Sequence, residues 1–342
     1  IIKFEPIVFF NIILGPQSHF YIIFLSSSHV ARRFFRKGGL FSFSSDYIDK
    51  DSGEKGVVKG NLLFKTQAAN ANNDKDLIEC ALNLEYLGAE FFLFGSMGYG
   101  LDTVSPNLAQ GGPSPVGGQM ARLDPLTKDI ICQFGLQEVG HLRAIKSTVK
   151  GFPRPLLNVS REVFGTIMDR AFGRPMVPPF DRYANSINFL LASYLIPYVG
   201  LTGYVRANPM LQSTASKQLV AGLLGVESGQ DAVIRALLYE KKSGLVVPYG
   251  MSVAEFTDRI SKLRDNLGNA GLKDEGLVVP IEQGSEGKVT GNILSANNNS
   301  LSYGRTPQEI LRISYGGGNE SVPGGFYPNG ADGRIAKSYL PQ

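Results

Sequence analysis

The sequence predicts an all-α fold, in which four long helices form a bundle with one long crossover connection. Four segments carry apolar residues at helical spacing, and glycine-rich or proline-rich stretches separate them. The chain has 342 residues, of which 43% are hydrophobic and 19% charged, so it has ample material for a core. Bundles with one long crossover build metal sites from inward-facing carboxylates and Glu-x-x-His pairs.

The first helix is expected over residues 74–95, with Asp74 or Asp76 as its cap. Glu85 falls on the apolar stripe of this helix, which comprises Ile78, Leu82, Ala89 and Phe92. Glycines and prolines fill residues 96–123, which predicts a long loop. A loop of this length in a compact domain is usually functional or packed as a lid.

The second helix is expected over residues 124–150, because Asp124-Pro125 is a cap followed by proline at the first helical position. Glu138 and His141 are three residues apart, so they share one face of this helix. That face is otherwise apolar, with Ile131, Phe134 and Ile145. A carboxylate and an imidazole in such a place are costly unless they are paired or bound to something.

The third and fourth helices follow a proline-rich crossover at residues 151–180, which contains a short amphipathic piece at 159–172. The third is expected to run from Asp181 until Pro197 kinks or breaks it. The fourth is expected over residues 213–242. Glu227 and Gln230 lie on its apolar stripe, which comprises Leu219, Leu223, Ile234 and Leu238.

The C-terminal region predicts two further helices, one from a capping box at Ser252 and Glu255 to about Leu267. The other is short and lies between Thr306 and the glycine run at 316–318. The remaining segments are expected to be ordered loops over the bundle. The expected domains are therefore residues 74–245, the bundle, and 246–342, the C-terminal helices and loops.

Residues 1–73 are expected to be a non-native, signal-like or disordered extension outside the fold. The chain starts at Ile1 and its first methionine is Met97, so this segment has no initiator. Its two apolar runs are too short to span a membrane. Residues 38–73 are rich in Ser, Gly, Asn and Lys and lack periodicity.

Composition excludes several classes of partner. The net charge is only +4 and no basic run is interleaved with aromatics, so nucleic acid is not expected as a partner. No transmembrane anchor is expected in the folded body. The two cysteines, Cys80 and Cys132, form neither a disulfide framework nor a zinc motif. A Ser-His-Asp triad around His141 is disfavoured by its apolar helical setting.

Three helices thus place Glu85, Glu138 with His141, and Glu227 with Gln230 on apolar stripes. A transition-metal or iron centre favours this mixture of carboxylate oxygens and imidazole. The alternative is a set of buried polar groups satisfied by each other, by tyrosines and by Arg143 and Arg235. The bundle-like spacing on three helices favours a metal origin for the pattern.

The chain resembles the plant desiccation-related proteins of the ferritin-like superfamily over about residues 76–340. Four blocks in the bundle carry the resemblance: LEYLGAEFF at 84–92, QEVGH at 137–141, PYVGLTGY at 197–204 and GVESGQD at 225–231. Two blocks in the tail support it: KDEGLVVP at 273–280 and VPGGFYP at 322–328. The resemblance implies a ferritin-like bundle. It also implies that the protein is secreted or resides in the endomembrane system or cell wall. Some members of the family are described as ferritin-like catalases.

The resemblance also implies a metal site, because manganese catalases and di-iron proteins use Glu, Glu-x-x-His, Glu and Glu-x-x-His. This chain keeps Glu85, Glu138, His141 and Glu227, and it has Gln230 in place of the second histidine. No acid lies between Asp181 and Glu227, so the third-helix glutamate has no equivalent. Gly88 and Arg206 also depart from the expected glutamate and glycine. Three acids and one imidazole favour a single ion, iron or manganese, and a ligand-free polar core is the other outcome.

Two functions remain open on these residues. The first is a metal-dependent, catalase-like redox protein that acts on hydrogen peroxide. The second is a secreted stress-protective protein that keeps the bundle with a degenerate metal site. An iron-storage cage is disfavoured by the long loops, and an oligomer is left open. Three glycosylation sequons, at Asn158, Asn298 and Asn319, are compatible with secretion.

Overall fold

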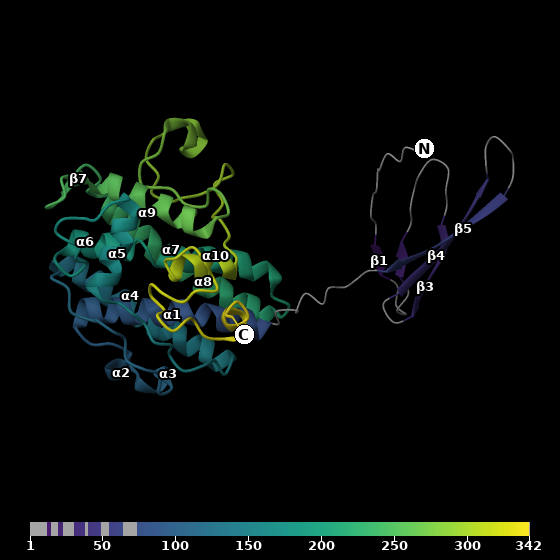
Figure 1. Cartoon of the computed structure of the whole chain (residues 1–342), viewed down its shortest axis with the longest axis horizontal. Helices are drawn as coiled ribbons and strands as arrows, with labels where there is room; N and C mark the ends of the chain where they lie inside the picture. The colour runs from purple at the N-terminus through teal and green to yellow at the C-terminus, as the bar shows by residue number, and fades with distance from the viewer. Residues whose placement is uncertain are drawn as a thin grey trace. The chain divides into compact units, whose positions relative to one another are not determined.

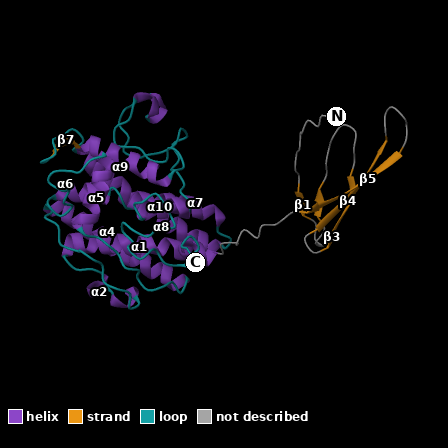
Figure 2. Cartoon of the chain, in the orientation of Figure 1, coloured by secondary structure: helices purple, strands orange, loops and turns teal. Residues whose placement is uncertain are grey.

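The computed structural model describes residues 12–14, 20–22, 31–37, 40–48, 55–63 and 74–341. The chain divides into two compact units, residues 1–71 and 72–342. The second unit consists mainly of helices joined by long loops, with one small two-stranded sheet (Figure 2). The all-α prediction is confirmed for this unit.

The described residues of the first unit form five strands in two antiparallel sheets. One sheet pairs β1 (Ile12–Leu14) with β2 (Phe20–Ile22). The other has the order β3 (Ala31–Lys37), β4 (Leu40–Ile48) and β5 (Lys55–Leu63). A non-native or disordered character for residues 1–73 stays a prediction. So does a signal-like character, and part of that segment lies outside the described residues.

Four helices form the centre of the second unit: α1 (Asp74–Met97), α4 (Pro125–Thr148), α7 (Pro197–Ala207) and α8 (Thr214–Glu240). Helix α1 packs along α4 and helix α7 packs along α8, while α1 also contacts α7 and α8. Figure 1 shows α1 and α4 running side by side through the middle of this unit. Residues from all four helices can therefore meet in one interior.

The ends of these helices follow the local chemistry of the sequence. Asp124 accepts a hydrogen bond from the Thr127 N–H at 3.0 Å, which caps α4. Ser213 accepts one from the Ser216 N–H at 3.0 Å, which caps α8. Both helices therefore begin within one residue of their predicted starts.

The third predicted helix is wrong in its extent. The structure has α6 (Ser186–Ser193), a turn, and then α7, which Pro197 starts as its first residue. Residues 181–185 are not helical, because Asn185 caps α6 through the Asn188 N–H at 2.9 Å. The break at Pro197 was predicted, but the helix that reaches the centre is the one after the break.

One stretch of the described residues, Ser186–Met210, is long and apolar enough to cross a membrane, with a mean hydropathy of 1.2. In this protein, 83% of the most apolar 18-residue window within it is buried. Its apolar character is therefore accounted for by packing in the helical core.

Two connections between the central helices contain short helices. The 96–123 connection includes α2 (Leu101–Val104) and α3 (Pro106–Ala109), and the crossover includes α5 (Arg161–Phe172). Buried Arg154 links both connections to α1: it pairs with Glu90 and donates to Asp102 at 2.8 Å. The two connections are therefore ordered parts of the fold.

The C-terminal segment packs on the central helices and contains the remaining elements: β6 (Leu245–Val246), β7 (Met251–Ser252), α9 (Val253–Gly268), α10 (Pro307–Ser314) and α11 (Arg334–Lys337). Three single-turn 3-10 helices complete the unit: η1 (Asn208–Met210), η2 (Ile281–Gln283) and η3 (Ser285–Gly287). Ser252 accepts from the Glu255 N–H at 3.2 Å, as the predicted cap requires. Both halves of a capping box form at Thr306 and Glu309.

Candidate metal centre

Four buried side chains from three helices converge in the interior of the helical unit. Glu85 comes from α1, Glu138 and His141 from α4, and Glu227 from α8. One ligand atom of each lies within 4.8 Å of the others. Metal–oxygen and metal–nitrogen bonds are about 2.0–2.2 Å, so ligands on opposite sides of one ion are roughly 4–4.5 Å apart. The cluster therefore has the dimensions of a site for a single ion.

His141 lies at the middle of the cluster. Its Nδ1 is 3.0 Å from Glu85 Oε2, 3.6 Å from Glu138 Oε2 and 3.8 Å from Glu227 Oε1. A single N–H can satisfy only one of these carboxylates at a time. The other two must find a proton or another cation.

The pKa values of Glu138, Glu227 and His141 are all raised, as this shortage of positive charge predicts. Burial, helped by the nearby Glu85 charge, raises the pKa of Glu138 to about 7. Burial and the charges of Glu138 and Glu85 raise the pKa of Glu227 well above its ordinary range. Burial lowers the pKa of His141, but the nearby carboxylates of Glu138 and Glu85, the second of which accepts a hydrogen bond from Nδ1, outweigh it and raise that pKa to about 11. Without a metal, the cluster therefore holds protons in place of a cation.

Glu138 shows most directly that a cation fits here. Neither of its carboxylate oxygens has a hydrogen-bond partner within the described part of the chain, although the side chain is almost fully buried. Buried carboxylates without partners are costly, and they are usually paired or bound to a metal. The donor set of three carboxylates and one imidazole suits iron or manganese.

Tyr204 on α7 is a site residue that the sequence analysis missed. Its hydroxyl donates to Glu85 Oε1, so Glu85 holds Tyr204 with one oxygen and His141 with the other. Burial and the charge of Glu85 raise the pKa of Tyr204 well above 10, so it remains a donor. Tyr204 lies in the PYVGLTGY block. The direction in which its side chain points depends on α7, a helix that was not predicted as a separate element.

Gln230, the predicted fifth ligand, is buried on α8 one turn after Glu227. Its Nε2 donates to Gln137 Oε1 at 3.3 Å, which joins α8 to α4. Its Oε1 has no partner among the residues that the structure describes. A ligand role for Gln230 stays a prediction.

Two glycines border the cluster where a side chain would enter it. A Cβ atom at Gly88 on α1 would lie 3.1 Å from Glu138 Oε2. A Cβ atom at Gly200 on α7 would lie 3.1 Å from Glu227 Oε2. A side chain at either position would press on a carboxylate of the cluster, so these two glycines leave Glu138 and Glu227 the space they occupy.

The alternative cations named from the sequence do not reach the cluster. Arg143 is exposed, while Arg235 donates to the Tyr194 hydroxyl at 2.7 Å and to backbone carbonyls. Within the described residues, the ion pairs of the three carboxylates involve His141 alone. That alternative also named tyrosines, and one of them, Tyr204, does contact the cluster through Glu85.

Comparison with known proteins agrees with this architecture. Residues 73–240 match the model of the ferritin-like domain, from the start of α1 to the end of α8. The chain is 58% identical over 267 residues to a ferritin-like catalase from Nesocodon mauritianus, a match that covers 78% of this chain and 86% of the relative.

The chain belongs to the ferritin-like family. It is also 55% identical over 262 residues to a desiccation-related protein from Craterostigma plantagineum, which covers 77% of this chain and 84% of that protein. No solved structure gives a significant match. The resemblance to ferritin-like, desiccation-related proteins inferred from the sequence blocks is confirmed.

Proposed function

We propose that this ferritin-like protein binds one iron or manganese ion between Glu85, Glu138, His141 and Glu227 and uses it to decompose hydrogen peroxide. The observation that carries the proposal is the convergence of four ligand atoms within 4.8 Å, one of them from a carboxylate without a hydrogen-bond partner. The name of the relative from Nesocodon mauritianus supports the choice of reaction.

The reaction is 2 H₂O₂ → 2 H₂O + O₂, and a bound redox-active ion supplies the electron exchange that it requires. Glu85, Glu138, His141 and Glu227 would hold the ion. The Tyr204 hydroxyl orients Glu85 through Oε1 and keeps its own proton. Burial of the whole cluster excludes bulk water, which strengthens every charge interaction inside it.

A second candidate is a stress-protective protein without catalysis. Two departures from the six-ligand pattern favour it: Gln230 stands in place of the second histidine, and the third-helix glutamate has no equivalent. In that case the polar cluster survives as part of the core. Addition of Fe²⁺ or Mn²⁺ would then leave the stability of the protein unchanged.

The test is elemental analysis of purified protein and oxygen release from hydrogen peroxide after reconstitution with Fe²⁺ or Mn²⁺. We expect about one ion per chain in the wild type and at least a tenfold loss of affinity and turnover in His141→Gln. Glu162→Gln, an exposed change on α5, is the control and should match the wild type. Wild-type protein that takes up neither ion would refute the proposal and favour the second candidate.

We also propose that the protein is secreted or resides in the endomembrane system or cell wall. Two of its sequons are exposed, at Asn298 and Asn319. Asn158 is half-buried and its side chain accepts from the Ser160 N–H at 3.1 Å. The exposed pair is therefore where glycans would be tolerated in the folded protein.

A further inference from the structure

A cavity with largely apolar walls lies beside the candidate metal centre, between α1, α7 and the segment that leads into α10. Its volume is about 50 Å³. A cavity needs roughly 10–15 Å³ to hold one water molecule, so there is room for about four non-hydrogen atoms. Its walls include Leu77, Ala81 and Leu84 of α1, Ala207 of α7 and Ile310 of α10.

Two residues that line the cavity also border the cluster. Tyr204 lines the cavity, and its hydroxyl donates to Glu85 Oε1. Gly200 also lines the cavity, and a Cβ atom there would lie 3.1 Å from Glu227 Oε2. Tyr204 and Gly200 therefore border both the cavity and the carboxylates of Glu85 and Glu227.

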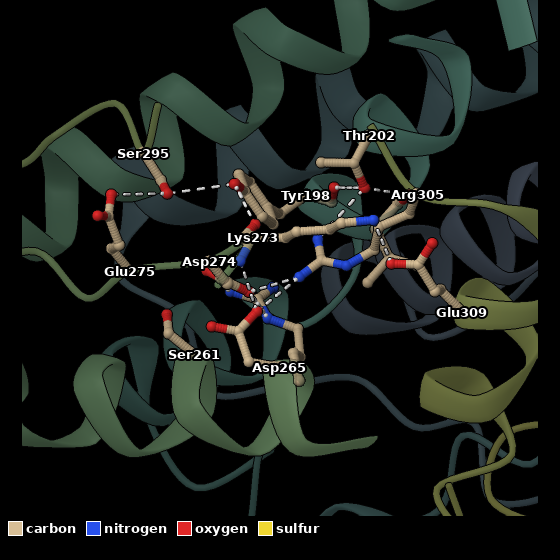
Figure 3. A network of polar contacts seen from close by, with 12 residues as sticks. Tyr198, Thr202, Ser261, Asp265, Lys273, Asp274, Glu275, Ser295, Arg305 and Glu309 are labelled. Carbon is tan, nitrogen blue, oxygen red and sulfur yellow. Dashed lines mark hydrogen bonds and ion pairs between the residues drawn. The ribbon is translucent and has the colours of Figure 1, made fainter. Parts of the chain in front are cut away.

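A polar network fixes the outer wall of the cavity. Buried Arg305 also lines the cavity, but its guanidinium donates to Thr202 Oγ1 at 3.3 Å and to Asp265 Oδ1 at 3.4 Å, and it lies 3.5 Å from Asp274 Oδ2. Figure 3 shows Arg305 held among these groups, between α7 and the C-terminal segment. The charge of Arg305 is thus already neutralised. Ile310, on another part of the wall, lies against α7 at Gly203.

We propose that this cavity binds the alkyl group of a small organic hydroperoxide, ROOH, whose peroxide end faces Tyr204 and the metal centre. This inference rests on the proposed peroxide function and names a second substrate class for the same site. An apolar cavity offers hydrogen peroxide little, whereas each methylene group buried there raises affinity about fourfold. A branched four-carbon group matches the available volume.

The overall reaction balances with hydrogen peroxide as the reductant: ROOH + H₂O₂ → ROH + H₂O + O₂. The O–O bond of the organic hydroperoxide breaks as it takes up two electrons and two protons. Hydrogen peroxide loses the same two electrons and two protons and leaves as O₂. No other reductant is required.

The first experiment measures binding of tert-butanol, the unreactive product, to metal-free protein by saturation-transfer NMR. We expect saturable binding to the wild type and at least tenfold weaker binding to Ala81→Leu and Ala207→Leu, which fill the cavity from α1 and from α7. The control is Ala221→Leu on the exposed face of α8, which should bind as the wild type does. Thermal unfolding of each variant establishes that it is folded.

Absence of binding to the wild type, or equal binding by folded Ala81→Leu and Ala207→Leu, would overturn the inference. The second experiment supplies metal-loaded protein with tert-butyl hydroperoxide and hydrogen peroxide together. We expect tert-butanol to form, and the ratio of tert-butanol to O₂ to fall at least tenfold in the two filling variants. Binding of tert-butanol without any O₂ release from hydrogen peroxide would instead count against the proposed function, and O₂ release without tert-butanol binding against the cavity.

Discussion

Replacing Glu138 by glutamine should have opposite effects on stability with and without a metal. In the metal-free protein, burial and Glu85 raise the pKa of Glu138 from 4.5 to about 7. The folded state therefore binds this proton more tightly than the unfolded state, and stability falls as the pH rises from about 4.5 to 7. At about 1.4 kcal/mol per pH unit, the loss above pH 7 is roughly 3 kcal/mol at most.

Glu138→Gln removes this loss, because the amide is neutral at every pH and has nearly the same shape. At pH 8 the metal-free variant should be about 1–3 kcal/mol more stable than the wild type, or roughly 2–10 °C higher in Tm. With Fe²⁺ or Mn²⁺ at 100 times the Kd of the wild type, bound metal adds about 3 kcal/mol to the wild type. The variant has lost a charged ligand and should gain much less, so the order of stability reverses.

The measurement is thermal unfolding followed by circular dichroism at pH 5 and pH 8, with chelator and with added metal. Glu162→Gln serves as the matched surface change and should follow the wild type in all four conditions. If Glu138→Gln shifts Tm by the same amount with chelator and with metal, the carboxylate is no metal ligand. If the variant is less stable than the wild type at pH 8 with chelator, the charge argument is wrong.

Three further predictions concern one residue each. Tyr204→Phe leaves a buried carboxylate oxygen without its donor and should lower the free energy of unfolding by about 1–3 kcal/mol in urea titrations. Burial raises the pKa of Asp231 to about 6 despite nearby arginines, so its ionised form destabilises the fold as pH rises from about 4 to 6. Asp231→Asn should therefore add about 1–3 kcal/mol at pH 8 and little at pH 4, and equal effects at both values would contradict this. Expression through a plant secretory pathway should give a glycan at Asn298, detected as a mass shift that Asn298→Gln removes.

The helices and the Glu138–His141 pair could be predicted because their signals are local. Apolar periodicity and caps such as Asp124 are encoded within a few residues. Spacing of three residues puts Glu138 and His141 on one face whatever the rest of the chain does. The convergence of that pair with Glu85 and Glu227 then follows from the packing of three apolar stripes.

Tyr204 and the Gln137–Gln230 contact depend on tertiary structure and have no local signal. A proline that restarts a helix resets its phase, so the residues of α7 that face the interior are decided by packing against α8. Gln137 precedes Glu138 by one position and looks like a rim residue until α8 is placed beside it.

The charge balance of the cluster argues for a single ion. Three ionised carboxylates carry three negative charges, and with a neutral His141 two divalent ions would leave an excess of one positive charge in a buried site. A single divalent ion and one retained proton balance the same three charges, and so does a single trivalent ion. Uncompensated charge is expensive to bury, so the site has the carboxylates for one ion in either oxidation state. The third-helix glutamate of the six-ligand pattern has no equivalent in this chain, so the fourth carboxylate that would balance a second divalent ion is lacking.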